Sequence, residues 1–101
     1  MAFKPILIEK EINGEIFKAQ FNGFSALLDA RQETEGSEKK AAEYIFKNVI
    51  VEPKIKDIDE FFGTNMELFS EVLAFGGEVM AADEKYFPKA EKEGSTGTSK
   101  K

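Results

Sequence analysis

Residues 6–21 read ILIEKEINGEIFKAQF, and this stretch decides the fold because two strand-like runs flank one tight turn. Asn13-Gly14 is a pair favoured in two-residue type I′ turns, where both residues take a positive φ. The runs on either side are rich in β-branched and aromatic residues, as strands are. The pattern therefore predicts an antiparallel hairpin with strands over 6–12 and 15–21.

The register of this hairpin follows from the turn. Pairing Ile12 with Glu15 leaves one face of the hairpin mostly apolar and the other mostly polar, with Glu9 directly opposite Lys18. Such a hairpin has one face buried and one face in water. Because an isolated hairpin is only marginally stable, we expect helices to cover its apolar face.

Two segments with apolar residues at helical spacing follow the hairpin. Asn22 is the predicted N-cap of a first helix, and Gly36 lies in the segment that ends it. Ser37 is the predicted cap of a second helix, which Pro53 stops. The end of this second helix, over 49–51, is β-branched and is expected to become extended. The apolar positions of the two helices are Phe24, Leu27 and Leu28 in the first, and Ala41, Ala42, Ile45, Phe46, Val49 and Ile50 in the second.

A third helical region begins with acidic residues at Asp57 and is interrupted at Gly63. Thr64 and Glu67 have the spacing of a capping box, which predicts the main helix over about 65–82.

Two adjacent glycines, Gly76 and Gly77, lie inside this main helix. Each costs about 1 kcal/mol relative to alanine, so the pair marks a kink, a close helix crossing or a hinge.

Taken together, the patterns predict an α+β fold in which the hairpin packs on three or four α-helices. Residues 1–87 are expected to form a single domain, and 88–101, rich in Lys, Gly, Ser and Thr, a flexible tail.

The formal net charge of −5 is concentrated in one region of the 101-residue chain. Residues 57–84 contain eight acidic and no basic residues, whereas residues 1–56 contain nine of each. This acidic region is either a solvated face or a docking surface for a basic partner. A chain that coats nucleic acid would instead be basic.

Catalysis and metal binding are not expected. The chain has no Cys and no His, which excludes the common nucleophile–base sets and most zinc sites. The carboxylates near Asp57 lack the spacing of a calcium loop, and no phosphate-binding motif surrounds Gly76. We expect no enzyme activity, no cofactor and no metal.

A membrane location is not expected either. No run approaches the roughly 20 apolar residues of a membrane span. The short apolar run near the N-terminus ends in charged residues, so it does not predict a signal peptide. The chain is therefore expected to be soluble and intracellular.

In their local sequence and in the order of their elements, residues 6–87 resemble the tail assembly chaperones of long-tailed bacteriophages. The likeness rests on the hairpin around Asn13-Gly14, the segment 46–53 (FKNVIVEP), the segment 56–62 (KDIDEFF), the acidic Phe-rich helix and the Lys/Gly/Ser/Thr-rich tail.

The resemblance implies a non-enzymatic protein of the infected bacterial cytoplasm that is absent from the mature virion. Such chaperones bind the tape measure protein, keep its long apolar helices soluble and recruit tail tube subunits. Many also exist in a longer, frameshifted form. A homo-oligomer is a further expectation, and neither nucleic acid nor membrane is expected as a partner.

Helix-in-groove packing would suit this task, because an acidic domain with surplus apolar residues can cover an apolar helix. The phenylalanines of the acidic region are either core residues or an exposed patch for a partner. The candidate partner-binding residues are Phe61, Phe62, Phe69, Leu73 and Phe75 for apolar contacts, and Glu67, Glu71 and Glu78 for the charged rim. Two other functions stay open: a small structural phage protein that assembles with itself, and an acidic inhibitor that mimics nucleic acid.

Overall fold

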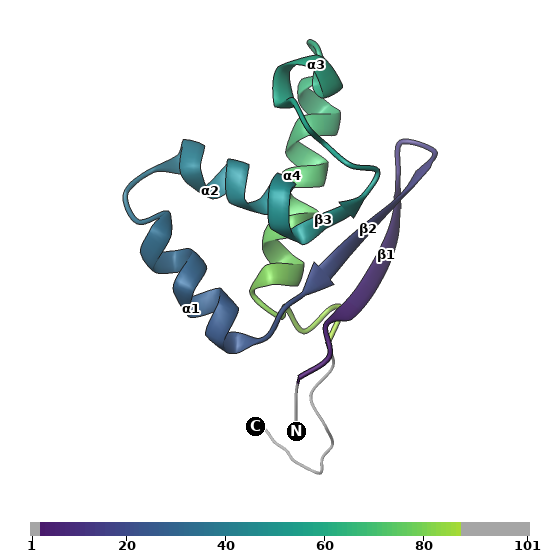
Figure 1. Ribbon diagram of the computed structural model, residues 1–101. Helices are drawn as coiled ribbons and strands as arrows, with labels where there is room; N and C mark the ends of the chain where they lie inside the picture. The colour runs from purple at the N-terminus through teal and green to yellow at the C-terminus, as the bar shows by residue number, and fades with distance from the viewer. Residues whose placement is uncertain (1–2, 88–101) are drawn as a thin grey trace, which may run out of the picture.

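The computed structural model describes residues 3–87; the predicted tail over 88–101 lies outside the described residues. The fold is α+β, as predicted, with a three-stranded antiparallel sheet and helices on one side of it (Figure 1). The strands are β1 (Ile6–Ile12), β2 (Glu15–Phe21) and β3 (Ile50–Glu52), in the order β1-β2-β3.

The hairpin has the predicted register. Ile12 pairs with Glu15 and Glu9 with Lys18. Asn13 and Gly14 take φ values of 56° and 81°, as a type I′ turn requires. The Lys18 ammonium lies 3.6 Å from a Glu9 carboxylate oxygen on β1. The two residues predicted to face each other therefore form a cross-strand ion pair.

The third strand was not predicted, although its extended conformation was. Helix α2 (Glu38–Tyr44) continues into the π-helix η1 (Ile45–Val49), and the chain then straightens into β3. Strand β3 pairs with β2 through Ala19↔Ile50 and Lys18↔Glu52. β-Branched residues suit this change because they fit a pleated surface better than a helix.

The N-cap of helix α1 (Phe24–Glu33) is Gly23, which has no side chain to cap the helix. The predicted cap, Asn22, is wrong because its side-chain amide donates instead to the Asn48 carbonyl, at 3.3 Å. Of the helix, only Leu27 and Ala30 are buried, since α1 packs on α2 away from the sheet (Figure 1).

The other predicted caps are mostly correct. Ser37 caps α2, and Asp57 caps α3 (Ile58–Phe62), which ends at Gly63. Helix α4 (Met66–Met80) begins one residue later than the predicted capping box implies. Its cap is Asn65, whose Oδ1 accepts from the Leu68 amide at 3.0 Å, so the prediction for Thr64 is wrong.

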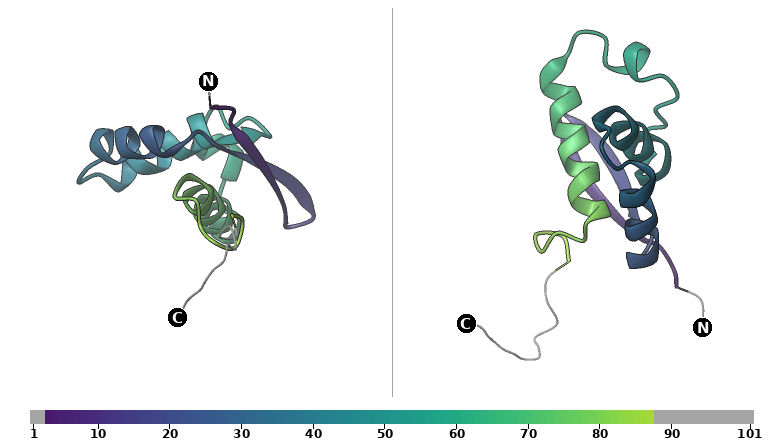
Figure 2. Two further views of the ribbon diagram at one scale, coloured as in Figure 1. Left: turned by 90° about the horizontal axis from the view of Figure 1, so that it is seen from below. Right: turned by 90° about the vertical axis from the view of Figure 1, so that its left-hand side faces the viewer.

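Helix α4 lies across the apolar face of the hairpin (Figure 2) and contacts β1, β2 and η1. It runs unbroken through both glycines. Gly76 is buried, and a methyl group on it would overlap Ile45 and press on Ile50. Of the three readings of the glycine pair, the structure selects a close crossing between α4 and η1. The largest fully buried side chains are Phe17, Phe46, Phe75, Val49, Val72 and Val79.

Candidate partner-binding site

The predicted partner-binding residues lie on α3 and α4, but the structure does not bring all of them together. They divide into an aromatic group at the junction of α3 and α4, a half-buried leucine on α4, a fully buried phenylalanine in the core, and carboxylates at two separate places on the surface. In that order these are Phe61, Phe62 and Phe69; Leu73; Phe75; and Glu67 and Glu71 at one place with Glu78 at the other.

The aromatic group joins three of the predicted residues to one that was not predicted. The Phe62 ring lies 4.8 Å from that of Phe61 and 5.3 Å from that of Phe69, measured between centroids. Phe46 of η1 lies 5.2 Å from Phe62 and 5.8 Å from Phe69. Phe46 and Phe62 are buried, whereas Phe61 and Phe69 are half-buried. Phe61 and Phe69 are therefore the members of this group with surface to offer a partner.

Phe75 is fully buried, so its prediction as a surface contact is corrected. Its ring faces the hairpin side of α4 and lies 5.5 Å from the Tyr86 ring, with the Lys10 ammonium 6.0 Å from its centroid. The apolar positions of α4 serve two faces, and Phe75 belongs to the face that packs on the sheet.

Glu67 and Glu71 are exposed and lie near the hairpin turn. With Asn13, Asn65 and Leu68 they line a small hollow of about 130 Å³. Glu78 is two turns further along α4 and half-buried. The three predicted rim carboxylates therefore do not border one surface.

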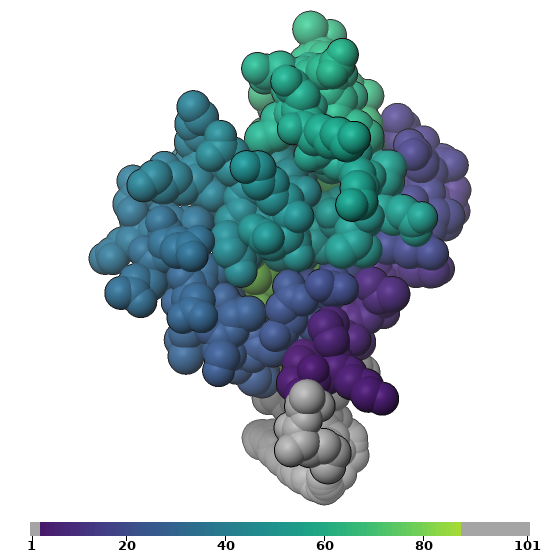
Figure 3. Space-filling view, viewed as in Figure 1, coloured from purple at the N-terminus to yellow at the C-terminus, as the bar shows by residue number. Residues whose placement is uncertain are grey.

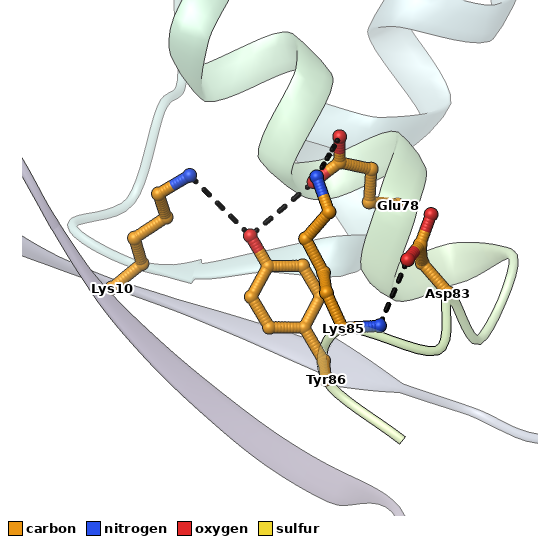
Figure 4. A network of polar contacts seen from close by, with 5 residues as sticks. All are labelled: Lys10, Glu78, Asp83, Lys85 and Tyr86. Atoms are coloured by element: carbon orange, nitrogen blue, oxygen red, sulfur yellow. Dashed lines mark hydrogen bonds and ion pairs between the residues drawn. The ribbon is translucent and has the colours of Figure 1, made fainter. Parts of the chain in front are cut away.

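Glu78 takes part in a polar network that holds the segment after α4 (Figure 4). Its carboxylate accepts from the Lys85 ammonium at 3.1 Å and from the Tyr86 hydroxyl at 3.3 Å. The Tyr86 hydroxyl in turn accepts from the Lys10 ammonium of β1 at 3.4 Å. The hydrogen bond and charge of Glu78 raise the pKa of Lys85. The partners of Glu78 are thus within the domain.

An open groove of about 700 Å³ lies between α2 and α4, and residues 55–59, which lead into α3, also line it. Phe46 and Ile55 form its buried floor. Ala42, Phe69 and Leu73 line it from the two helices and are half-buried. Two of the predicted apolar contacts, Phe69 and Leu73, therefore face a real groove.

The rim of the groove carries both signs of charge. Its acidic residues are Glu38, Glu43, Asp57 and Asp59, and its basic residues are Lys39, Lys47 and Lys56. A second hollow of about 500 Å³ shares Lys47 and Lys56 and continues the groove toward Lys54. Figure 3 shows the face of the molecule on which α2, η1 and α3 meet. The groove is therefore less acidic than residues 57–84 alone suggest.

The sequence does not predict the residues of α2, η1 and segment 54–56 as site residues, because an apolar stripe at helical spacing usually packs in the core. The alternation of Lys47, Lys54 and Lys56 with Ile50 and Ile55 is the signal that could have indicated a charged rim above an apolar floor.

A separate apolar patch lies where β2 passes into α1. Phe3 and Phe24 both pack edge-on against Phe21, with ring centroids at 5.9 and 5.3 Å. They stay 54% and 64% exposed, and Leu28, one turn along α1, is 63% exposed. Such a patch is a usual mark of a contact surface. We call Phe3, Phe24 and Leu28 the α1 patch.

Within residues 3–87, no group of three or more His, Cys, Asp or Glu side chains is arranged to hold a metal ion. None of the described helices combines the length and apolar character needed to cross a membrane. Comparison with protein-family models, with curated proteins and with solved structures finds no match to this chain.

Proposed function

We propose that this chain is a non-enzymatic tail assembly chaperone of a long-tailed bacteriophage, acting in the cytoplasm of the infected cell and absent from the virion. It binds apolar helices of the tape measure protein, keeps that protein soluble and recruits tail tube subunits. The resemblance of residues 6–87 to that family supports this proposal, and the groove between α2 and α4 carries it.

The groove suits an amphipathic helix. Its floor and walls are apolar, from Phe46, Ile55, Phe69 and Leu73, and an apolar helical stripe laid there would leave water. Its rim carries both signs of charge, so the matching helix has an apolar stripe flanked by acidic and basic residues. The net charge of −5 would keep such a complex in solution.

Two neighbouring alanines of α2 provide a matched test. Ala42 lines the groove, whereas Ala41 does not, and both are half-buried. Ala42→Glu places a long charged side chain in the groove, and Ala41→Glu makes the same chemical change outside it. Each variant is co-expressed with the tape measure protein of the same phage, and the soluble, co-purified tape measure protein is measured.

We expect Ala42→Glu to lose most of the capture and Ala41→Glu to keep it, with both variants folded by circular dichroism. Undiminished capture by folded Ala42→Glu would exclude the groove as the site. If the unmodified chain neither captures nor solubilises the tape measure protein, the chaperone function itself is wrong.

The α1 patch favours a second candidate, a structural phage protein that assembles with itself. Phe24 and Leu28 are more than half exposed on one side of α1, and a second copy could cover them. A stable ring formed by the chain alone, seen by light scattering, would support this candidate. The nucleic-acid mimic gains no such observation, because lysines interrupt the acidic residues at the groove.

A further inference from the structure

The chain contains two Asn-Gly pairs in different environments, Asn13-Gly14 and Asn22-Gly23. Asn-Gly is the dipeptide most prone to spontaneous deamidation, because glycine has no side chain to hinder attack by its own backbone nitrogen on the asparagine amide. The reaction needs an exposed pair whose side chain and backbone are free to rearrange. The two pairs can therefore be ranked by their surroundings.

Asn13-Gly14 meets the requirement. Both residues are exposed at the tip of the hairpin, and the ladder pairs Ile12 with Glu15 and leaves them outside it. Apart from Gly14 and its two chain neighbours, no residue has a heavy atom within 4 Å of the position that a Gly14 Cβ would take. Opening of such a turn costs little, since the tip of a hairpin is among the least stable parts of a sheet.

Asn22-Gly23 is restrained on several sides. The Asn22 Oδ1 accepts from the Gln20 side-chain amide at 2.6 Å, and its Nδ2 donates to the Asn48 carbonyl at 3.3 Å. The Gly23 carbonyl accepts from the Leu27 amide at 3.1 Å. The Phe3 ring covers Gly23, 3.4 Å from the position of a Cβ there.

We propose that Asn13 is a site of spontaneous deamidation and that the fold protects Asn22. Solvent base removes the Gly14 amide proton, and the nitrogen attacks Cγ of Asn13. The new N–Cγ bond forms as the Cγ–Nδ2 bond breaks, and the side-chain nitrogen leaves as ammonia with a proton from water. A water molecule then opens the succinimide at either carbonyl, giving aspartate or isoaspartate at position 13 without any change of oxidation state.

The product alters the surface beside two of the predicted partner carboxylates. Asn13 lines the hollow that also contains Glu67 and Glu71, so deamidation adds a third negative charge there. Isoaspartate also lengthens the backbone within the two-residue turn, which the type I′ geometry does not accommodate. This inference does not depend on the proposed function.

The purified full chain is aged at mildly alkaline pH in heavy-oxygen water and digested with a protease specific for Lys and Arg. Cleavage after Lys10, Lys18 and Arg31 places Asn13 and Asn22 in separate peptides. We expect the Asn13 peptide to gain the mass of an acid carrying heavy oxygen, as two chromatographic isomers, at least several-fold faster than the Asn22 peptide.

Two controls separate structure from local chemistry. In denaturant the two pairs should react at similar rates, because each is an Asn-Gly in an unfolded chain. Gln20→Ala, which removes the hydrogen bond to Asn22 Oδ1, should speed reaction at Asn22 in the folded protein. Equal native rates, a faster reaction at Asn22, or no native reaction at Asn13 when the denatured chain reacts would overturn the proposal.

Discussion

Gly76 of α4 lies directly against Ile45 of η1, so closely that a methyl group on Gly76 would overlap the Ile45 side chain. The neighbouring Gly77 has room, since its Cβ would lie 3.8 Å from Ile45 Cδ1, an ordinary contact. The two adjacent glycines therefore differ in their structural role. Only Gly76 allows α4 to approach the π-helix and, through it, β3.

This difference predicts opposite effects of two alanine substitutions. Gly76→Ala overpacks the crossing and should destabilise the fold by about 1–3 kcal/mol. Gly77→Ala gains helix propensity and should stabilise it by up to about 1 kcal/mol. Denaturant unfolding of the two variants measures both free energies. A neutral Gly76→Ala would show that the crossing is looser than the structure has it.

The start of α4 gives a second pair of variants. Asn65 supplies the side-chain cap, with its Oδ1 3.0 Å from the Leu68 amide, whereas Thr64 is exposed before it. Asn65→Ala should lower the free energy of unfolding by about 1 kcal/mol, the usual cost of losing an N-cap. Thr64→Ala should change it by less than about 0.5 kcal/mol. If Thr64→Ala proved more destabilising than Asn65→Ala in thermal or urea unfolding, Thr64 and not Asn65 would be the N-cap.

Local patterns predicted much of the fold. The turn at Asn13-Gly14 set the register of β1 and β2, and Ser37, Asp57 and Gly63 marked helix ends, because each of these features depends on a few neighbouring residues. The missed pairing of β3 with β2 joins residues about thirty positions apart. Nothing in the segment 50–52 itself specifies that partner.

The candidate site was only partly predictable for the same reason. Spacing on α4 identified Phe69 and Leu73 as apolar, but it could not say that they face α2 while Phe75 faces the sheet. Which apolar side chains of α4 remain accessible depends on where α2 and η1 pack in the folded domain. Phe46 and Ile55 entered the site only through that tertiary arrangement.

Lys18 joins all three strands, and this arrangement predicts a response to pH. Its ammonium lies 3.1 Å from Glu52 of β3 and 3.6 Å from Glu9 of β1. The hydrogen bond and charge of Glu52, and then the charge of Glu9, raise the Lys18 pKa above its usual 10.5. A raised pKa in the folded state means that the interaction stabilises the fold below the pKa of the unfolded chain. The stabilisation is lost as the pH rises through the folded pKa.

Lys18→Met tests this expectation through the melting temperature. The deficit of the variant relative to the unmodified chain should be constant at neutral pH and shrink on the alkaline side of pH 10.5. It should also shrink with added salt, because the side chains are exposed and their attraction is screened. Lys40→Met, which removes an exposed lysine of α2, is the control and should show neither trend. A deficit that persists at high pH would mean that Lys18 acts through its methylene groups.

The Tyr86 hydroxyl bridges β1 and α4, and its removal separates polar from apolar contributions. Tyr86→Phe loses the hydrogen bonds with Glu78 and Lys10 and should cost about 0.5–1.5 kcal/mol. Tyr86→Ala also removes the ring that packs 5.5 Å from Phe75 and should cost more. Equal losses in urea unfolding would mean that the ring contributes nothing.

The α1 patch predicts self-association that depends on protein concentration. Phe24 and Leu28 are exposed on a helix whose buried side is only Leu27 and Ala30, so replacing both with serine removes apolar surface from the outside of the fold. Phe24→Ser/Leu28→Ser should lower the free energy of unfolding by about 0.5–1.5 kcal/mol, because the Phe24 ring also packs against Phe21. It should lower the average mass measured by light scattering at high concentration. Gln32→Ser, at an exposed position of the same helix, should leave the mass unchanged. A mass that is monomeric at every concentration for all three proteins would show that the α1 patch is not covered by a second copy.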